Sequence, residues 1–227
     1  MTRVLALVLG AGRSRRMGDC VNKMLLTAGG RTVLEWSVAV FERCPLVARI
    51  YVTASAEDVS QYRSLLGAFS KVAAVIEGGA ERQESVYRAL RQMRAAESEN
   101  PLVAVHDGAR PMLADATLVR LLHEAERAGG AILAVPAKET MKRVQDDIIV
   151  ETVPRESLMA AQTPQVFSLD VLLEAHKRAS EAGFVATDDA MLIERMGGVV
   201  RVVAGDYDNL KITTPEDLVA LRAVHGR

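Results

Sequence analysis

The stretch VLALVLGAGRSRRMG, Val4–Gly18, decides the fold class of this chain. Its first six residues are all apolar, and a strand that is apolar on both faces is typical of a parallel sheet covered by helices. Three glycines and three arginines follow within nine residues. Glycine lets backbone N–H groups approach oxygen atoms closely, so such a turn is typical of phosphate-binding loops. We expect an α/β fold with an anionic ligand at the end of this strand.

The spacing of this loop excludes two common nucleotide-binding motifs. A dinucleotide-binding fingerprint needs a third glycine at the position of Arg15. A P-loop needs Gly-Lys-Ser/Thr, but Gly18 is followed by Asp19. A tight turn with solvated arginines remains the alternative interpretation of the loop.

Further apolar runs alternate with helical segments along the chain. Thr32 and Glu35 form a capping box before one helix, and Val86, Leu90 and Met93 share one face of another. This alternation predicts a doubly wound, Rossmann-like fold, with a mainly parallel sheet and helices on both faces. The further expected strands are Arg49–Ala54, Val72–Ile76, Leu102–Asp107, Ala131–Pro136 and Val199–Ala204.

The segment Lys138–Val153 interrupts this alternation. It alternates loosely between polar and apolar residues and has Asp146–Asp147 in its middle, which predicts a β-hairpin. An isolated hairpin has too little core of its own, so we expect it to pack on a second copy of the chain. We therefore predict one domain over residues 1–227, with a protruding β-arm at about 138–155.

Composition narrows the class of protein. The 227 residues are 49% hydrophobic and 25% charged with a formal net charge of −1, which is typical of a globular chain and argues against nucleic-acid or membrane-surface binding. No apolar run approaches the ~20 residues of a membrane span, and we interpret Val4–Leu9 as a core strand rather than a secretion signal. Cys20 and Cys44 form neither a disulfide framework nor a zinc motif, which favours a cytoplasmic location.

Charged residues follow several of the expected strands. Lys23 lies just beyond the first loop, Lys211 follows the last strand, and Gly78–Gly79 follow the third. Asp107 ends the fourth strand, where a carboxylate can hold Mg²⁺ together with phosphate oxygens. A role for Asp208 as a second metal-binding carboxylate stays open.

Other polar residues have simpler interpretations. We expect His106 to be a core or hinge histidine and Cys20 to have no role in catalysis. Asp188 and Asp189 are typical of the start of a helix, where carboxylates meet the positive end of the dipole.

Seven motifs together carry a resemblance that covers almost the whole chain. Any one of them alone is weak, because AGxSxRMG occurs in many nucleotidyltransferases. In the order and spacing of these motifs, the chain resembles nucleotidyltransferases of the sugar-nucleotide pyrophosphorylase type. It resembles more closely the 2-C-methyl-D-erythritol 4-phosphate cytidylyltransferase family of non-mevalonate isoprenoid biosynthesis. The motifs are GAGRSRRMG, GGAERQESV, HDGARP, ETMKR, QTPQVF, TDDA and DNLKIT.

The resemblance implies that CTP lies across the strand ends and that pyrophosphate is released. It implies catalytic roles for Arg16, Lys23 and Lys211, whose charges would neutralise the triphosphate together with Mg²⁺. No general base is needed, because a phosphate with a second pKa of about 6 is already ionised near neutral pH. The implied nucleotide-binding residues are Gly10, Ala11, Gly12, Arg16, Lys23, Gly79, Ala80 and Ser85.

The resemblance also implies a site for the sugar-alcohol phosphate, with Asp107 as the metal ligand. Thr140 and Arg155 belong to the arm, which in this family reaches into the neighbouring subunit of a homodimer. The implied acceptor-binding residues are Asp107, Arg110, Thr140, Arg155, Thr163 and Lys211.

Three positions depart from the family pattern: Asn22 replaces a frequent proline, Ala80 a usual acid and Gly108 a usual alanine. Three other functions stay open: a ribitol 5-phosphate cytidylyltransferase, a cytidylyltransferase for the molybdenum cofactor, and a nucleotide-binding domain without turnover. The arm with Arg155 favours a small sugar-alcohol phosphate over a pterin, but does not decide between erythritol and ribitol.

Overall fold

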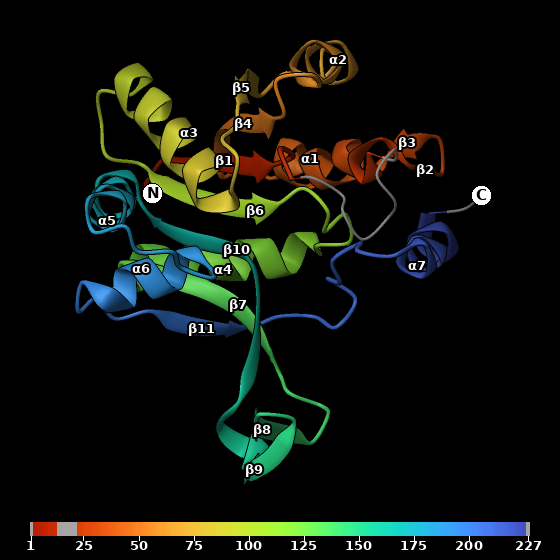
Figure 1. The fold of residues 1–227 in the computed structure, drawn as a ribbon. Coiled ribbons are helices and arrows are strands. Elements are labelled where there is room, and N and C mark those ends of the chain that lie inside the picture. The colour runs from red at the N-terminus through yellow and green to blue at the C-terminus, as the bar shows by residue number, and fades with distance from the viewer. Residues whose placement is uncertain (1, 13–21, 226–227) are drawn as a thin grey trace.

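A seven-stranded sheet forms the centre of the computed structural model, which describes residues 2–12 and 22–225 (Figure 1). The strand order is β11-β7-β10-β6-β1-β4-β5, and β10 alone runs antiparallel to its two neighbours. The prediction of an α/β fold with a mainly parallel sheet is confirmed. The strands are β1 (Val4–Leu9), β4 (Val47–Ala54), β5 (Val72–Glu77), β6 (Leu102–Asp107), β7 (Gly130–Pro136), β10 (Met159–Ser168) and β11 (Arg201–Ala204).

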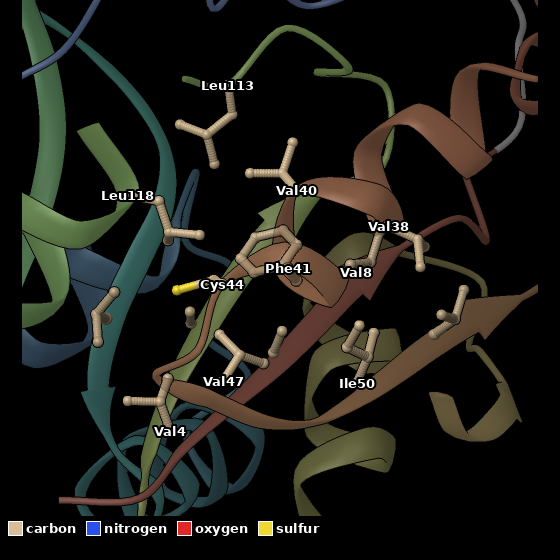
Figure 2. Packing of buried hydrophobic residues seen from close by; sticks show 14 of the residues in the cluster. Val4, Val8, Val38, Val40, Phe41, Cys44, Val47, Ile50, Leu113 and Leu118 are labelled. Carbon is tan, nitrogen blue, oxygen red and sulfur yellow. The ribbon is translucent and has the colours of Figure 1, made fainter. Parts of the chain in front are cut away.

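Helices cover both faces of this sheet, which explains the uninterrupted apolar sequence of β1. Val4, Ala6 and Val8 pack with α1, α2 and α4 on one face, whereas Leu5 and Leu7 pack with α3, α5 and α6 on the other. Figure 2 shows the first of these faces, where Val8 of β1 lies among side chains of α1 and β4. The helices are α1 (Val33–Arg43), α2 (Val59–Leu65), α3 (Arg82–Ala96), α4 (Asp115–Ala128), α5 (Leu169–Glu181), α6 (Asp189–Arg195) and α7 (Pro215–His225).

Two local predictions are confirmed in detail. The Thr32 hydroxyl accepts a hydrogen bond from the Glu35 N–H at 3.2 Å, and the Glu35 carboxylate accepts one from the Thr32 N–H at 2.8 Å, so α1 begins with a capping box. Asp188 caps α6 by accepting a hydrogen bond from the Met191 N–H at 3.0 Å, and Asp189 lies in its first turn.

Some strands differ from the sequence prediction, and β4 begins at Val47, two residues earlier than predicted. β10 was not expected, because Gln162 and Thr163 interrupt its apolar pattern where its register on β7 shifts. β11 begins two residues later than predicted, since Val199 is exposed after the turn at Gly197.

The arm consists of β8 (Met141–Gln145) and β9 (Ile148–Val153), which pair antiparallel and project away from the main sheet (Figure 1). Its turn places Asp146 and Asp147 at φ values of 48° and 61°, a left-handed conformation that aspartate tolerates better than most residues. The hairpin prediction is confirmed. The pairing of the arm with a second copy stays a prediction, motivated by exposed apolar side chains at Met141, Val144, Ile148, Ile149 and Val150.

No helix among residues 2–12 and 22–225 is long and apolar enough to cross a membrane.

Candidate functional site

A pocket of about 380 Å³ lies at the carboxyl ends of β1, β4 and β6. Because these strands are neighbours and parallel, the loops that follow them meet at one edge of the sheet. The pocket therefore collects residues from six separate parts of the chain. Its lining comprises Leu9, Ala11, Gly12, Lys23, Met24, Thr53, Ala80, Glu81, Arg82, Ser85, Asp107, Ala109 and Lys211.

The loop after β1 is held rigidly at Gly10. The Gly10 N–H lies 3.0 Å from the Thr53 carbonyl and 3.2 Å from its hydroxyl oxygen, while the Tyr62 hydroxyl donates to the Gly10 carbonyl at 3.3 Å. Burial raises the pKa of Tyr62 to about 12, so this hydroxyl remains a donor at neutral pH. A Cβ on residue 10 would lie 2.7 Å from the Thr53 oxygen, so only glycine fits without movement.

Gly10→Ala is expected to lower the free energy of unfolding by about 1–3 kcal/mol, the usual cost of overpacking. Gly12→Ala is the matched control, because a Cβ there meets no atom within 4 Å in the part of the chain that the structure describes. Its expected effect is within about 0.5 kcal/mol. Urea unfolding of the two variants measures the difference, and equal stabilities would contradict the steric account.

The loop after β5 approaches the loop after β1 closely. A Cβ on Gly78 would lie 2.5 Å from the Cβ of Ala11, so glycine lets the two loops meet. The Ser85 hydroxyl accepts a hydrogen bond from the Gly79 N–H at 3.0 Å, and the Glu84 carboxylate accepts one from the Ala80 N–H at 2.8 Å. The start of α3 thus shapes this loop.

Lys23 is held at the pocket by the short 3₁₀ helix Lys23–Leu25. The Asn22 side chain caps this turn by accepting a hydrogen bond from the Met24 N–H at 3.0 Å, and its amide donates to the Tyr62 hydroxyl at 3.1 Å. Asn22, which stands where the family often has proline, therefore stabilises the turn that carries Lys23. The Lys23 ammonium group donates to the Ile212 carbonyl at 3.1 Å, which joins this turn to the loop of Lys211.

Asp107 lies among three cations. Its carboxylate is 2.8 Å from the Lys211 Nζ, 3.5 Å from the Arg82 Nε and 3.8 Å from the Arg110 Nε. Burial alone would raise the pKa of Asp107, but the charges of Lys211 and Arg82, and to a lesser extent Arg110, hold it well below the usual range. Asp107 is therefore ionised at neutral pH.

Sequence reasoning missed Arg82, although it lies inside the quoted motif GGAERQESV. Its position between the two glycines and Ser85 was the available signal. An arginine at the start of a helix with alternating charges is usually solvent-exposed. The sequence pattern therefore gave no sign that Arg82 contacts Asp107.

The donor chemistry at Asp107 fits a magnesium ion that is shared with phosphates. Among the described residues, no group of three or more His, Cys, Asp or Glu side chains could hold a metal ion alone. Mg²⁺ commonly uses one or two carboxylates and completes its shell with substrate phosphate oxygens and water. The ionised carboxylate of Asp107, in a pocket that Lys23 and Lys211 also line, suits that arrangement.

His106 and Thr163 lie buried beneath Asp107. The Thr163 hydroxyl oxygen accepts a hydrogen bond from the Asp107 N–H at 3.0 Å and lies 3.1 Å from the His106 Nδ1. The His106 Nε2 lies 3.0 Å from the Arg110 carbonyl, so Nε2 carries the proton and Nδ1 accepts from Thr163. The interpretation of His106 as a core residue is confirmed, since it is fully buried.

Acid should destabilise the fold through His106. Burial lowers its pKa from 6.5 to about 4, so stability is lost as the pH falls from about 6.5 to about 4. At pH 5 the expected loss is about 2 kcal/mol, because the unfolded chain binds the proton and the folded chain does not. Urea unfolding at pH 7 and pH 5 should show this loss in wild type and in His123→Gln, but not in His106→Gln. Equal acid sensitivity of all three would contradict it.

Several predicted site residues do not line the pocket. Gly10 and Gly79 lie next to lining residues, and Arg110 donates to the Asn209 carbonyl at 2.7 Å. Thr140 and Arg155 lie on the arm or at its base, where Arg155 donates to the Lys138 carbonyl at 2.8 Å. Arg16 and Cys20 lie outside the described residues, and Asp208 lines a different cavity, beside Trp36.

Known proteins resemble this chain over nearly its whole length. The family model of 2-C-methyl-D-erythritol 4-phosphate cytidylyltransferase matches residues 4–226. A relative of that name from Geobacter metallireducens is 46% identical, covering 97% of this chain and 96% of the relative. Another of that name, from Geobacillus kaustophilus, is 42% identical, covering 96% of this chain and 95% of the relative.

Solved structures agree with these relatives. A 4-diphosphocytidyl-2C-methyl-D-erythritol synthase from Anaerococcus prevotii has a TM-score of 0.86 and 27% identity, with 100% of this chain and 97% of that chain covered. A 2-C-methyl-D-erythritol 4-phosphate cytidylyltransferase from Thermus thermophilus has a TM-score of 0.76 and 34% identity, with 96% of each chain covered. With the Gly-rich loop, Asp107 and the two lysines gathered at one pocket, this chain belongs to the 2-C-methyl-D-erythritol 4-phosphate cytidylyltransferase family of nucleotidyltransferases.

Proposed function

We propose that the pocket binds CTP and 2-C-methyl-D-erythritol 4-phosphate and joins them into CDP-2-C-methyl-D-erythritol, in non-mevalonate isoprenoid biosynthesis. A phosphate oxygen of the acceptor attacks the α-phosphorus of CTP and forms a new P–O bond. The bond from that phosphorus to the bridging oxygen breaks, and pyrophosphate leaves. The observation that carries the proposal is that Lys23, Lys211 and Asp107, from three separate parts of the chain, line one pocket.

The residues act by alignment and by neutralising charge. Two polyanions must approach each other, so cations fixed beforehand at the reacting phosphates supply most of the stabilisation. Lys23 and Lys211 carry this role in the pocket, and we assign the same role to Arg16, which lies outside the described residues, from the family resemblance. No side chain needs to remove a proton, because the attacking phosphate is already ionised near neutral pH.

The nucleoside is held by the loops after β1 and β5. The backbone at Gly10–Gly12 and Ala80 faces the ribose and phosphates, while Gly79 and Ser85 select the small amide-like edge of cytosine. A Mg²⁺ ion at Asp107, when bound, offsets negative charge on the triphosphate. Asp107 would contribute one oxygen ligand, and Arg110 and Thr163 keep its strand end in place.

The arm supplies the acceptor contacts in a homodimer. Thr140 and Arg155 are exposed and do not line the pocket of their own chain. The exposed apolar side chains of the arm favour a second copy of the chain as its partner. One nucleotidyltransferase domain per chain, in a cytoplasmic homodimer, is the proposed assembly. Sedimentation of the wild-type chain tests it, and a monomer at micromolar concentration would contradict it.

Thr140→Ala and Arg155→Ala are expected to raise the KM for the sugar phosphate about tenfold or more, since a charge-assisted phosphate contact contributes about 1.5–3 kcal/mol. The KM for CTP should change by less than about twofold. Steady-state kinetics with each substrate varied in turn measures the split. Lys142→Ala, on strand β8 of the arm, is the matched control. Equal effects on both KM values would contradict a specific contact of Thr140 and Arg155 with the sugar phosphate.

A pyrophosphate-release assay with CTP and a panel of acceptors tests the activity itself. We expect release with 2-C-methyl-D-erythritol 4-phosphate and much less with ribitol 5-phosphate or with ATP in place of CTP. A preference for ribitol 5-phosphate would assign the rival acceptor. No release with any acceptor, from chain that binds CTP, would favour a binding domain without turnover.

A further inference from the structure

A buried ion pair continues the charge cluster of Asp107 into the core. Arg82 lines the pocket, and its Nε lies 3.5 Å from Asp107 while its Nη2 lies 2.7 Å from the Asp189 carboxylate. The Asp189 side chain is fully buried and also lies 2.9 Å from the His176 Nε2. One guanidinium group thus spans a carboxylate in the pocket and a carboxylate in the core.

The three cations around Asp107 differ in what holds their other end. The Lys211 side chain is 40% exposed, so it can turn from Asp107 towards a bound phosphate. Arg110 is tied to the neutral Asn209 carbonyl. Arg82 forms an ion pair with the Asp189 carboxylate on the side away from the pocket. It therefore stays in place when Lys211 turns.

Asp189 is itself fixed by the strand next to β6. The Gln165 side-chain oxygen accepts hydrogen bonds from the N–H groups of Asp189 and Ala190 at 3.0 and 2.9 Å. Gln165 pairs with Val105, two residues before Asp107. Asp189, on α6, and Asp107, at the end of β6, are therefore linked through the adjacent strands β10 and β6.

We propose that Arg82, anchored by Asp189, is a positioning residue that fixes the orientation of the Asp107 carboxylate for the metal ion of the reaction. This inference depends on the proposed function, because it takes Asp107 as the metal ligand. Arg82 lies at one Asp107 oxygen, Oδ1, and leaves Oδ2, beside Lys211 and Arg110, as the oxygen that would bind the metal. Groups that orient a metal-binding carboxylate typically contribute about 10- to 100-fold in metal affinity or activity.

Asp189→Asn tests this from outside the pocket. The amide is the same size and keeps an oxygen for His176, but it loses the charge that holds Arg82. We expect binding of Mn²⁺, measured by electron paramagnetic resonance with CTP present and no acceptor, to weaken about tenfold. With the acceptor, kcat should fall about 10- to 100-fold, while the KM for CTP changes less than about threefold.

Asp188→Asn is the matched control, because Asp188 lies in the same turn and does not contact Arg82. It should leave Mn²⁺ binding and kcat within about twofold of wild type. Arg82→Lys keeps the charge but lacks the planar fork that reaches both carboxylates, so it should behave like Asp189→Asn.

The outcomes are distinct. A folded Asp189→Asn variant with the Mn²⁺ affinity of Asp188→Asn would overturn the inference. Should Asp189→Asn not fold, the double variant Arg82→Met/Asp189→Asn leaves no buried unpaired charge and decides the same point. A wild-type chain that releases no pyrophosphate would overturn the proposed function, while the Mn²⁺ comparison would still judge the role of Arg82.

Discussion

Lys23→Ala is expected to lower kcat by about 10²- to 10³-fold, the usual cost of removing one fixed charge from a transition state. Lys23 is half-buried at the mouth of the pocket and is tied to the Ile212 carbonyl at 3.1 Å. Its ammonium group is therefore already in position before the substrates bind. The KM for CTP should change less than kcat, because charge on the phosphates grows as the reaction proceeds.

The control for this prediction is Lys177→Ala on α5, an exposed lysine that lies 4.0 Å from Glu181. It removes the same charge far from the pocket and should leave kcat unchanged. Urea unfolding must show that Lys23→Ala is folded at the assay temperature. A folded Lys23→Ala variant with a kcat near that of wild type would remove Lys23 from the proposed mechanism.

Asp107→Asn should be nearly as damaging, with a loss in kcat of at least about 10²-fold, because stabilisation by a bound metal is typically worth several kcal/mol. The amide is a weaker metal ligand and leaves the surrounding cations without their shared carboxylate. The variant should still fold, because Arg82 retains its ion pair with Asp189 and Arg110 retains its hydrogen bond to the Asn209 carbonyl. Measuring kcat as a function of Mg²⁺ concentration tests this, with a higher metal requirement expected.

Asp208→Asn gives the comparison for Asp107. Asp208 lines another cavity, so its substitution should leave the magnesium dependence unchanged. If Asp208→Asn raised the metal requirement as much as Asp107→Asn, the metal would have a second carboxylate that the pocket lining does not include.

Local patterns predicted most of the sheet and several of its details. The apolar run of β1, the capping box of α1 and the Asp146–Asp147 turn depend on residues within a few positions of one another. Such short-range preferences act before any tertiary contact forms. β10 escaped prediction because Gln162 and Thr163 are buried polar residues, and their partners come from distant parts of the chain.

Much of the candidate site followed from the same local reasoning, since each loop was placed at the end of a strand. Lys23, Asp107 and Lys211, placed from the strand ends, line the pocket, and so does Ser85, which the family resemblance implied. Thr140 and Arg155 do not join it within one chain, because the arm carries them away from the sheet.

Residue order alone determined the α/β class and the protruding hairpin, because periodicity and turn residues are properties of short segments. The glycine spacing of the first loop predicted phosphate binding, which stays a prediction. The junction of Arg82 with Asp107 and Asp189 was decided only by folding. These residues belong to α3, β6 and α6, which lie far apart in the chain and meet only after the crossovers are complete. An ion pair acts over a few ångströms, so its partners have to be identified in space.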